Sequence, residues 1–370
     1  MDLEIDFLAI GGETQSGDAI VLKYGNLQGE RNEYSVVVID AGFEEDGNKV
    51  VEHIKNIYKT GTIDLLVSTH PDNDHSGGII NILEQLEVKK IWMHKPWDHT
   101  DNISKLFKHP AVTDDSVENR IEKGLAIAKS IEEKAEELGI QIEEPFTGSL
   151  DDRKQLLAIG PDKEYYLKEL LPNFRCTPEP KSFVKTIAEG IESLGESIKK
   201  FFEESWDLET LDNGGTTTAE NNSSVILLLM LDDNYHVLFT ADAGQPAITR
   251  VLNLLNSANY DYSKIKFIQV PHHGSHRNIN PDILDKIVGP KLGQETNLVI
   301  KTVVVSVALK EDGKHPSKRA TNAFRRRGAP VHQTRGVSIY HSFGNTPRKN
   351  SYPSSTPAPF FNGKIEDDEE

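Results

Sequence analysis

Histidines and aspartates are closely spaced at one place in the chain, the run His70-Pro-Asp72-Asn-Asp74-His75. Imidazole nitrogens and carboxylate oxygens are ligands that divalent metal ions take in proteins. A loop can direct such neighbours at one or two adjacent ions, whereas a helix would spread them around its axis. Because a bound divalent ion activates water, the run predicts a metal-dependent hydrolase. The alternative role for these side chains is capping of a helix.

Further metal-ligand residue types follow other apolar, strand-like runs. They are Asp40 after YSVVVI, Asp242 after HVLFTA, and the pair His272 and His273 after KFIQVP. The run at His70 itself follows the strand-like segment IDLLVST. Since α/β folds gather their chemistry at the carboxyl ends of strands, we expect these side chains to lie close together.

The elements that would position these residues alternate between strands and helices. Strand-like runs are EIDFLAIG, DAIVLKYG, YSVVVIDAG and IDLLVST, with helical patterns at residues 49–58 and after Gly78. A second group starts with SVILLLML and HVLFTADAG, a hairpin turning at residues 232–234. It continues with a helix at 247–255, the strands KFIQV and VIKTVVVSVAL, a helix at 318–327 and a closing strand around 336–340.

The composition shifts between about residues 97 and 215. Helical spacing of apolar residues predicts amphipathic helices at 117–138 and 183–202, and LLAIGPDKEYYLKELLP predicts a strand followed by a short helix. We interpret this region as a helical insertion within one domain of residues 1–345. Its helices would form a cover or a surface for a protein partner. Residues 346–370, which are rich in Pro and Ser and end in IEDDEE, are expected to form a flexible acidic tail.

Bulk properties describe an ordinary globular chain. Of the 370 residues, 37% are hydrophobic and 27% charged, and no apolar run approaches the ~20 residues of a membrane span. The N-terminus lacks the basic region of a secretory signal, and the single Cys176 excludes an intrachain disulfide framework. These features predict a cytoplasmic protein without membrane association.

The net charge of −17 argues against a protein that coats polyanions, but the charge is unevenly distributed. The segment from Lys314 to Arg335 is basic and has no acidic residue. Its members Lys314, Lys318 and Arg319 are therefore candidate contacts to a phosphate-bearing substrate. The alternative is that the segment forms the solvated face of an amphipathic helix.

Taken in order, the motifs resemble the metallo-β-lactamase superfamily, and within it the hydrolase domain of ComEC-type DNA-uptake proteins. The matching segments are THPDNDHSGG, ENNSS, TADAG, VPHHGS and KHPS, and the resemblance runs from about Asp6 to Ser342. It implies an α/β, four-layer αβ/βα sandwich. It also implies two divalent metal ions, Zn²⁺ or Mn²⁺, with Mg²⁺ possible.

The resemblance further implies a role for each site residue. Asp74, His75 and His273 would bind one ion, His70 and Asp72 would bind the other, and Asp242 would bridge them. Asp40 would orient the metal loop through hydrogen bonds, and His272 would be either a residue beside the ligands or a ligand itself. His315 of KHPS would contact a phosphate oxygen or protonate the leaving oxygen, so that Asp74 and His315 are the expected catalytic residues.

Two positions depart from the superfamily signature. Asp72 stands where the signature has a histidine, and Asn221 or Asn222 stands where another is usual. Both changes remove imidazoles from the first metal site, so that this site should shift from Zn²⁺ towards Mn²⁺ or Mg²⁺, or be weakly filled.

These observations favour a phosphodiesterase or nuclease acting on DNA or another nucleic acid. Two alternatives stay open: hydrolysis of a small nucleotide or lipid phosphodiester, and a partner-regulated or non-catalytic component of a larger complex. A basic groove long enough for several phosphates would favour nucleic acid, whereas a closed pocket would favour a small substrate.

Overall fold

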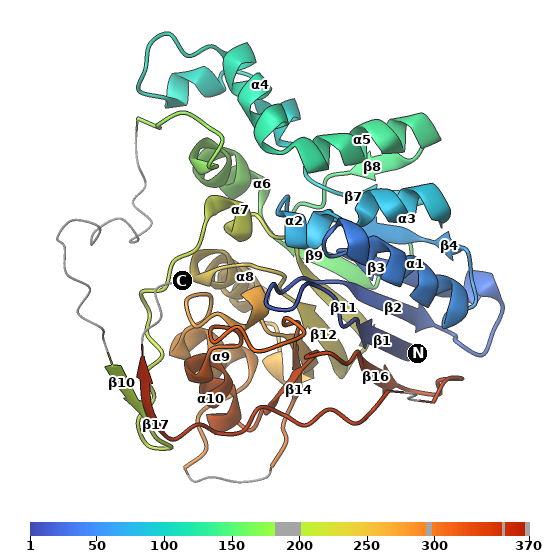
Figure 1. The fold of residues 1–370 in the computed structure, drawn as a ribbon, viewed down its shortest axis with the longest axis vertical. Helices are drawn as coiled ribbons and strands as arrows, with labels where there is room; N and C mark the ends of the chain where they lie inside the picture. Colours follow the sequence, from blue (N-terminus) through green and yellow to red (C-terminus); the bar gives the residue numbers. More distant parts are fainter. Residues whose placement is uncertain (182–200, 294–297, 350–351, 367–370) are drawn as a thin grey trace.

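The computed structural model describes residues 1–181, 201–293, 298–349 and 352–366, and is built on two large β-sheets (Figure 1). The first sheet has seven strands in the order β16 (Ile339–Phe343), β1 (Asp2–Phe7), β2 (Ile20–Gly25), β3 (Tyr34–Ile39), β5 (Leu65–Val67), β7 (Lys90–Trp92), β8 (Gln141–Glu143). The second has six in the order β15 (Val331–Gln333), β14 (Thr302–Val305), β13 (Ile265–Gln269), β12 (Tyr235–Phe239), β11 (Ile226–Asp232), β9 (Leu156–Gly160). Both sheets mix antiparallel and parallel pairs.

Period-two alternation explains how the sheets pack. In β3, Val37 and Ile39 belong to the apolar core between the sheets, whereas Val36 and Val38 pack with the helices outside. Phe7 of the first sheet meets Phe267 of the second with ring centroids 5.6 Å apart. Strand β3 is therefore apolar on both buried faces, whereas β1 has the buried, ion-paired Glu4 and Asp6 on the face opposite Leu3, Ile5 and Phe7.

Helices form the two outer layers. On the first sheet lie α1 (Gly47–Asn56), α3 (Ile79–Gln85) and α5 (Ala126–Leu138), and α4 (Asp114–Gly124) packs beside α5 farther from the sheet. On the second sheet lie α8 (Gln245–Ser257), α9 (Pro281–Ile287) and α10 (Lys318–Arg326). The arrangement is the predicted four-layer αβ/βα sandwich, and the predicted hairpin is present as β11 and β12.

The helix expected at residues 117–138 is interrupted. It is divided into α4 and α5 at Leu125, whose φ of −114° and ψ of 40° are not helical. The preceding Gly124 packs against Cys176, which would lie 2.3 Å from a β-carbon at that position. The helix expected at 183–202 falls outside the described residues up to 200, and residues 201–204 form the strand β10 (Phe201–Glu204).

The interval expected to be a helical insertion also contributes to the core. Its strand β8 extends the first sheet beside β7, and its strand β9 forms the edge of the second sheet beside β11. After β9 the chain forms α6 (Lys163–Tyr165), a π-helical turn (Tyr166–Leu170) and a 3₁₀ turn (Leu171–Asn173). Residues 97–215 therefore combine covering helices with two strands of the sandwich.

The C-terminal segment has regular structure where a flexible tail was expected. Strand β17 (Gly363–Glu366) pairs antiparallel with β10. Before it, the backbone N–H of Phe361 donates to the side-chain oxygen of Asn322 in α10, and the amide nitrogen of Asn322 donates back to the Phe361 carbonyl. The segment thus lies across α10.

Within the described ranges, no helix is long and apolar enough to cross a membrane.

The short strands β4 (Thr62–Ile63) and β6 (Glu87–Val88) pair beside the first sheet. The strands β3, β5, β12, β13 and β14 all end at the same edge of the sandwich, where the polar residues singled out in the sequence follow them.

Candidate metal centre

Four side chains from both sheets converge at this edge. Asp74 and His75 lie in α2 (Asn73–Ser76) after β5, Asp242 follows β12, and His273 lies in a 3₁₀ turn after β13. One ligand atom from each lies within 4.8 Å of the others. His75 Nε2 is 3.2 Å from Asp242 Oδ1, and His273 Nε2 is 3.2 Å from Asp74 Oδ2. We call these residues the four-residue half of the centre.

Three buried polar atoms at this edge of the sandwich are suited to bind a divalent ion. The Nε2 atoms of His70 and His75 and the Oδ1 atom of Asp242 are buried and have no hydrogen-bond partner. A buried polar atom without a partner is costly, and coordination of a cation removes that cost. The donor set of imidazoles and carboxylates matches Zn²⁺ or Mn²⁺.

Each histidine of the centre has its Nδ1 atom in contact with a hydrogen-bonding group. His75 Nδ1 lies 2.7 Å from Asp40 Oδ2, and His273 Nδ1 lies 3.1 Å from the carbonyl oxygen of Ser306. Both partners can only accept, so Nδ1 carries the proton and donates it. In the neutral ring, Nε2 is then left with a lone pair that faces the centre.

The same argument applies to His70. The hydroxyl of Thr69 donates its single hydrogen to Asp40 Oδ2 at 2.6 Å, so it accepts from His70 Nδ1 at 3.0 Å. Asp40 also accepts from the backbone N–H of Thr69 at 2.8 Å. The carboxylate of Asp40 therefore orients His75 directly and His70 through Thr69.

His272 lies beside the carboxylate of Asp242. Its Nε2 atom is 3.6 Å from Asp242 Oδ2, and its Nδ1 atom is 3.0 Å from the side-chain oxygen of Asn278. His70 Nε2 approaches the same carboxylate oxygen at 3.8 Å. Asp242 is thus shared by two groups of donors. One is the four-residue half, and the other consists of His70, His272 and Asp242, which we call the His70 half.

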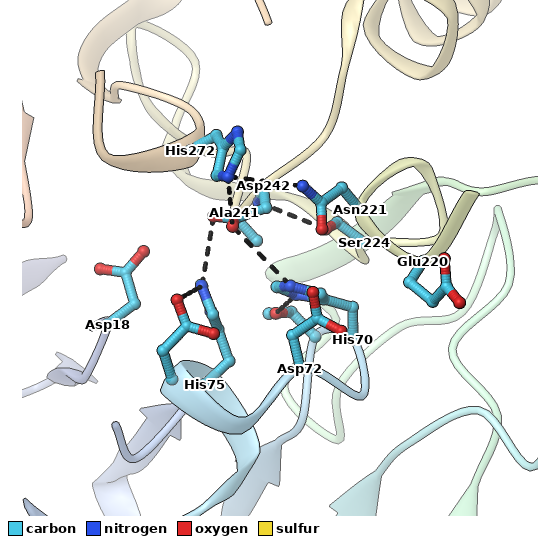
Figure 2. A network of polar contacts seen from close by, with 12 residues as sticks. Asp18, His70, Asp72, His75, Glu220, Asn221, Ser224, Ala241, Asp242 and His272 are labelled. Atoms are coloured by element: carbon cyan, nitrogen blue, oxygen red, sulfur yellow. Dashed lines mark hydrogen bonds and ion pairs between the residues drawn. The ribbon is translucent and has the colours of Figure 1, made fainter. Parts of the chain in front are cut away.

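The His70 half also distinguishes the two asparagines. Asn221 in α7 (Ala219–Asn222) directs its amide towards His272 Nε2, at 3.4 Å (Figure 2). Asn222 instead donates to the carbonyl of Thr218 and packs against Gly244. Asn221 is therefore the one that faces the centre.

Asp72 is not one of the four converging residues. Its Oδ1 atom accepts a hydrogen bond from the guanidinium of Arg175 at 2.7 Å. Arg175 also contacts Glu220 through Nε at 3.3 Å. Asp72 is still close enough to His70 for its charge to act on the pKa of that ring, so the predicted ligand lies beside His70 with its carboxylate paired to Arg175 (Figure 2).

The charges of the cluster shift one another's protonation. Against the effect of burial, Asp242 and Asp74 raise the pKa of His273 to about 9, and Asp242 and Asp40 raise the pKa of His75 well above its ordinary value. Burial and the neighbouring His75 lower the pKa of His70. Despite their burial, the carboxyls of Asp74 and Asp242 have a lowered pKa because His75 is close. Protons and a metal ion would therefore compete for the same ring nitrogens.

The backbone at the centre adopts an uncommon conformation. Asp40, Ala241, His272 and His273 have φ values of 58°, 44°, 47° and 51°, in the left-handed region that non-glycine residues rarely occupy. Each such residue costs about 1–3 kcal/mol and is found mainly at functional sites. The turns place their side chains at the common edge of the two sheets.

His315 lies beside the centre. Its ring centroid is 6.2 Å from those of His272 and His273, and its Nδ1 atom is 3.1 Å from Asp312 Oδ2. The expected proton donor is thus within reach of a substrate bound at the cluster.

The basic segment from Lys314 to Arg335 differs most from its expected role. Arg319 is 2% exposed, and its guanidinium contacts the Thr210 carbonyl and Asp212. Lys314 and Lys318 are exposed, with the Lys318 ammonium 4.4 Å from the ring centroid of Phe361.

The two arginines at the end of α10 are fully internal. Arg326 pairs with the buried Glu204 at 2.6 Å, and Arg327 pairs with Glu209 at 2.6 Å and with Asp285 at 2.7 Å. Their charges stabilise contacts between α10 and residues 204–209 and are not available to a polyanion.

Three residues near the centre had not been singled out from the sequence. Asp18, just before β2, is buried, accepts from the amide of Gln269 at 2.8 Å, and has a pKa raised by burial. Arg175 holds Asp72, and Ser306 orients His273. Only Asp18 had a local signal, as a carboxylate opening a strand; the others act through contacts between distant parts of the chain.

Comparison with known proteins gives a partial match. Residues 31–141 match the family model of the metallo-beta-lactamase superfamily. That stretch contains Asp40 and the loop from His70 to His75, but not Asp242 or His273. The curated proteins contain no match.

Solved structures share low identity with the chain. A proposed metallo-beta-lactamase from Thermotoga maritima is 10% identical, with 70% of this chain and 92% of that chain covered and a TM-score of 0.36. The Rm3 metallo-beta-lactamase is 10% identical, with 77% and 84% covered and a TM-score of 0.31. A metallo-beta-lactamase from Hirschia baltica is 12% identical, with 69% and 80% covered and a TM-score of 0.29. These similarities are too low to indicate which reaction this chain performs.

Proposed function

We propose that this protein is a metal-dependent hydrolase that cleaves phosphodiesters, with an ion held by Asp74, His75, Asp242 and His273. The observation that carries the proposal is the convergence of these four side chains, with both histidines fixed through Nδ1 and their Nε2 atoms directed inward. When bound, a divalent ion would supply Lewis-acid activation of water and of the phosphoryl oxygen.

The residues of the chain contribute positioning and proton transfer. Asp40 and the Ser306 carbonyl keep the rings of His75 and His273 in one orientation, which lowers the reorganisation that binding requires. His315, with Nδ1 directed at Asp312, would deliver a proton from Nε2 to the leaving oxygen.

Ligand chemistry and the distribution of charge both support a phosphodiester. The aspartates Asp74 and Asp242 provide hard oxygen ligands of the kind that Mn²⁺ and Mg²⁺ use with phosphate substrates. Burial of Arg319, Arg326 and Arg327 removes much of the cationic surface expected for a long polyanion. This favours a substrate engaged through one or a few phosphates over one bound along many.

The direct test is hydrolysis of bis-p-nitrophenyl phosphate and of single-stranded DNA by protein loaded with Mn²⁺, Mg²⁺ or Zn²⁺. We expect hydrolysis of the small ester, loss of this activity in Asp74→Asn, and normal activity in the exposed turn variant Asp233→Asn. If the wild type binds metal and cleaves neither substrate, a non-catalytic or partner-regulated role replaces the proposal.

Salt dependence separates the substrate classes. Contact with a single phosphate predicts that log(kcat/KM) falls with log[salt] with a slope of about −1 or shallower. Efficient cleavage of DNA with a slope of about −4 or steeper would instead indicate a nucleic-acid substrate bound through several phosphates.

The leaving group tests His315. We expect His315→Gln to lower kcat about a hundredfold for an ester with an alkyl leaving group, which needs protonation. The same variant should retain most activity on a p-nitrophenyl ester, whose leaving group departs as a stable anion. Equal losses on both esters would contradict the proton-donor role.

A further inference from the structure

Asp72 begins α2 but does not act as its cap. Its backbone is extended, with φ −69° and ψ 145°, as expected for an N-cap residue, yet its side chain makes no capping hydrogen bond. The carboxylate instead accepts from Nη2 of Arg175 at 2.7 Å. The orientation of Asp72 is therefore set by the arginine and not by its own helix.

Arg175 is anchored without help from Asp72. Its backbone N–H donates to Glu220 Oε1 at 2.6 Å, and its Nε contacts the same oxygen at 3.3 Å. Glu220 is 2% exposed. The neighbouring Phe174 is buried and packs edge-on against Tyr166, with ring centroids 6.1 Å apart. The guanidinium would stay in place if Asp72 left it.

The contact between Asp72 and Arg175 is easily exchanged. The side chains are 26% and 63% exposed, so that water screens their attraction. An ion pair of this kind shifts a competing equilibrium by up to about fivefold. A divalent ion bound by carboxylate and imidazole ligands can overcome such a contact. The carboxylate of Glu220 is buried and also accepts from the backbone N–H of Arg175, so this second contact holds residue 175 in place.

We propose that Arg175 is a positioning residue that competes with a metal ion for the Asp72 carboxylate, so that an ion in the His70 half gains Asp72 as a ligand by displacing the guanidinium. This inference rests on the proposed metal-dependent function. The four-residue half has converging ligands, whereas the carboxylate of Asp72 is engaged by Arg175. The expected behaviour is one tightly bound ion and a second, weaker one.

Titration of the metal-free protein with Mn²⁺ alone, followed by calorimetry, measures both ions without reference to activity. In Arg175→Ala we expect the second equivalent to bind up to about fivefold more tightly and the first to be unchanged. Arg175→Lys, which keeps the charge but loses the forked geometry, should lie between the two. Arg250→Ala, which removes another exposed ion-paired guanidinium, is the matched control and should change neither.

The double variant Arg175→Ala, Asp72→Asn identifies the route of the effect. If Arg175 acts through Asp72, the double variant binds the second equivalent no more tightly than Asp72→Asn alone. A gain that persists would mean that only the arginine's charge repels the ion, and it would overturn the proposal. An unchanged second equivalent in Arg175→Ala would overturn it as well. Failure of the wild type to bind even the first equivalent would be distinct, since it would reject the metal-dependent function itself.

Discussion

The two halves of the centre share Asp242 but differ in how their ligands are held. In the four-residue half, the rings of His75 and His273 are fixed through Nδ1, and the carboxylates of Asp74 and Asp242 lie 3.2 Å from ring nitrogens. In the His70 half, the expected carboxylate ligand is paired with Arg175. The difference teaches that metal-ligand residue types within one motif can have different partners, because groups outside the motif, such as Arg175, engage some of them.

Removal of the shared carboxylate should have the largest effect. We expect Asp242→Asn to weaken metal binding in both halves and to lower kcat/KM by about a hundred- to a thousandfold. Metal content of the purified variant and hydrolysis of bis-p-nitrophenyl phosphate measure the two effects. Thermal unfolding serves as the control for folding. A normal metal content in Asp242→Asn would mean that Asp242 is not a ligand shared by the two halves.

A smaller effect is expected from Asp40, which contacts no ion in this account. Asp40→Asn keeps the shape of the side chain but weakens its acceptance from His75 Nδ1 and Thr69. The affinity for the first ion should fall about 10- to 100-fold. A chelator competition assay gives this affinity. An unchanged value would show that the ring of His75 is held by packing alone.

Proton competition should distinguish the halves by pH. In the metal-free protein the pKa of His273 is about 9, so below that pH the ring carries a proton that an ion must displace. Affinity of the four-residue half should therefore rise with pH, about tenfold per unit for each proton displaced, between about pH 6 and 8. Burial lowers the pKa of His70, so binding at this ring should release fewer protons over the same range.

Calorimetric titration in two buffers of different ionisation enthalpy counts the protons released with each ion. Release with the first ion and less with the second would support the assignment of the tight ion to the four-residue half. An affinity for the first ion that stays constant over this pH range would contradict it.

Local patterns in the sequence predicted the strands and the positions of the metal-ligand residues. Alternation in the run ending at Ile39 predicted β3, and strand-end logic brought Asp40, Asp242 and His273 to one edge because parallel strands end together. These inferences succeed since they depend on periods of two residues and on the geometry of sheets.

Contacts between distant residues lay beyond such patterns. Arg326 reads as part of a basic helix face, yet it is buried against Glu204, 122 residues earlier in the chain. Asp72 and Arg175 are separated by 103 residues. No local period encodes either pair, so the sequence overestimated the cationic surface and did not reveal that Asp72 is paired with Arg175.

The most direct test of the central claim is an anomalous-difference map from crystals of the protein dialysed against a limiting amount of Zn²⁺. The account predicts one strong peak bounded by Asp74, His75, Asp242 and His273, with Asp72 still paired to Arg175 at this ion concentration. A peak coordinated instead by His70, Asp72 and Asn221, with the four-residue half empty, would contradict it.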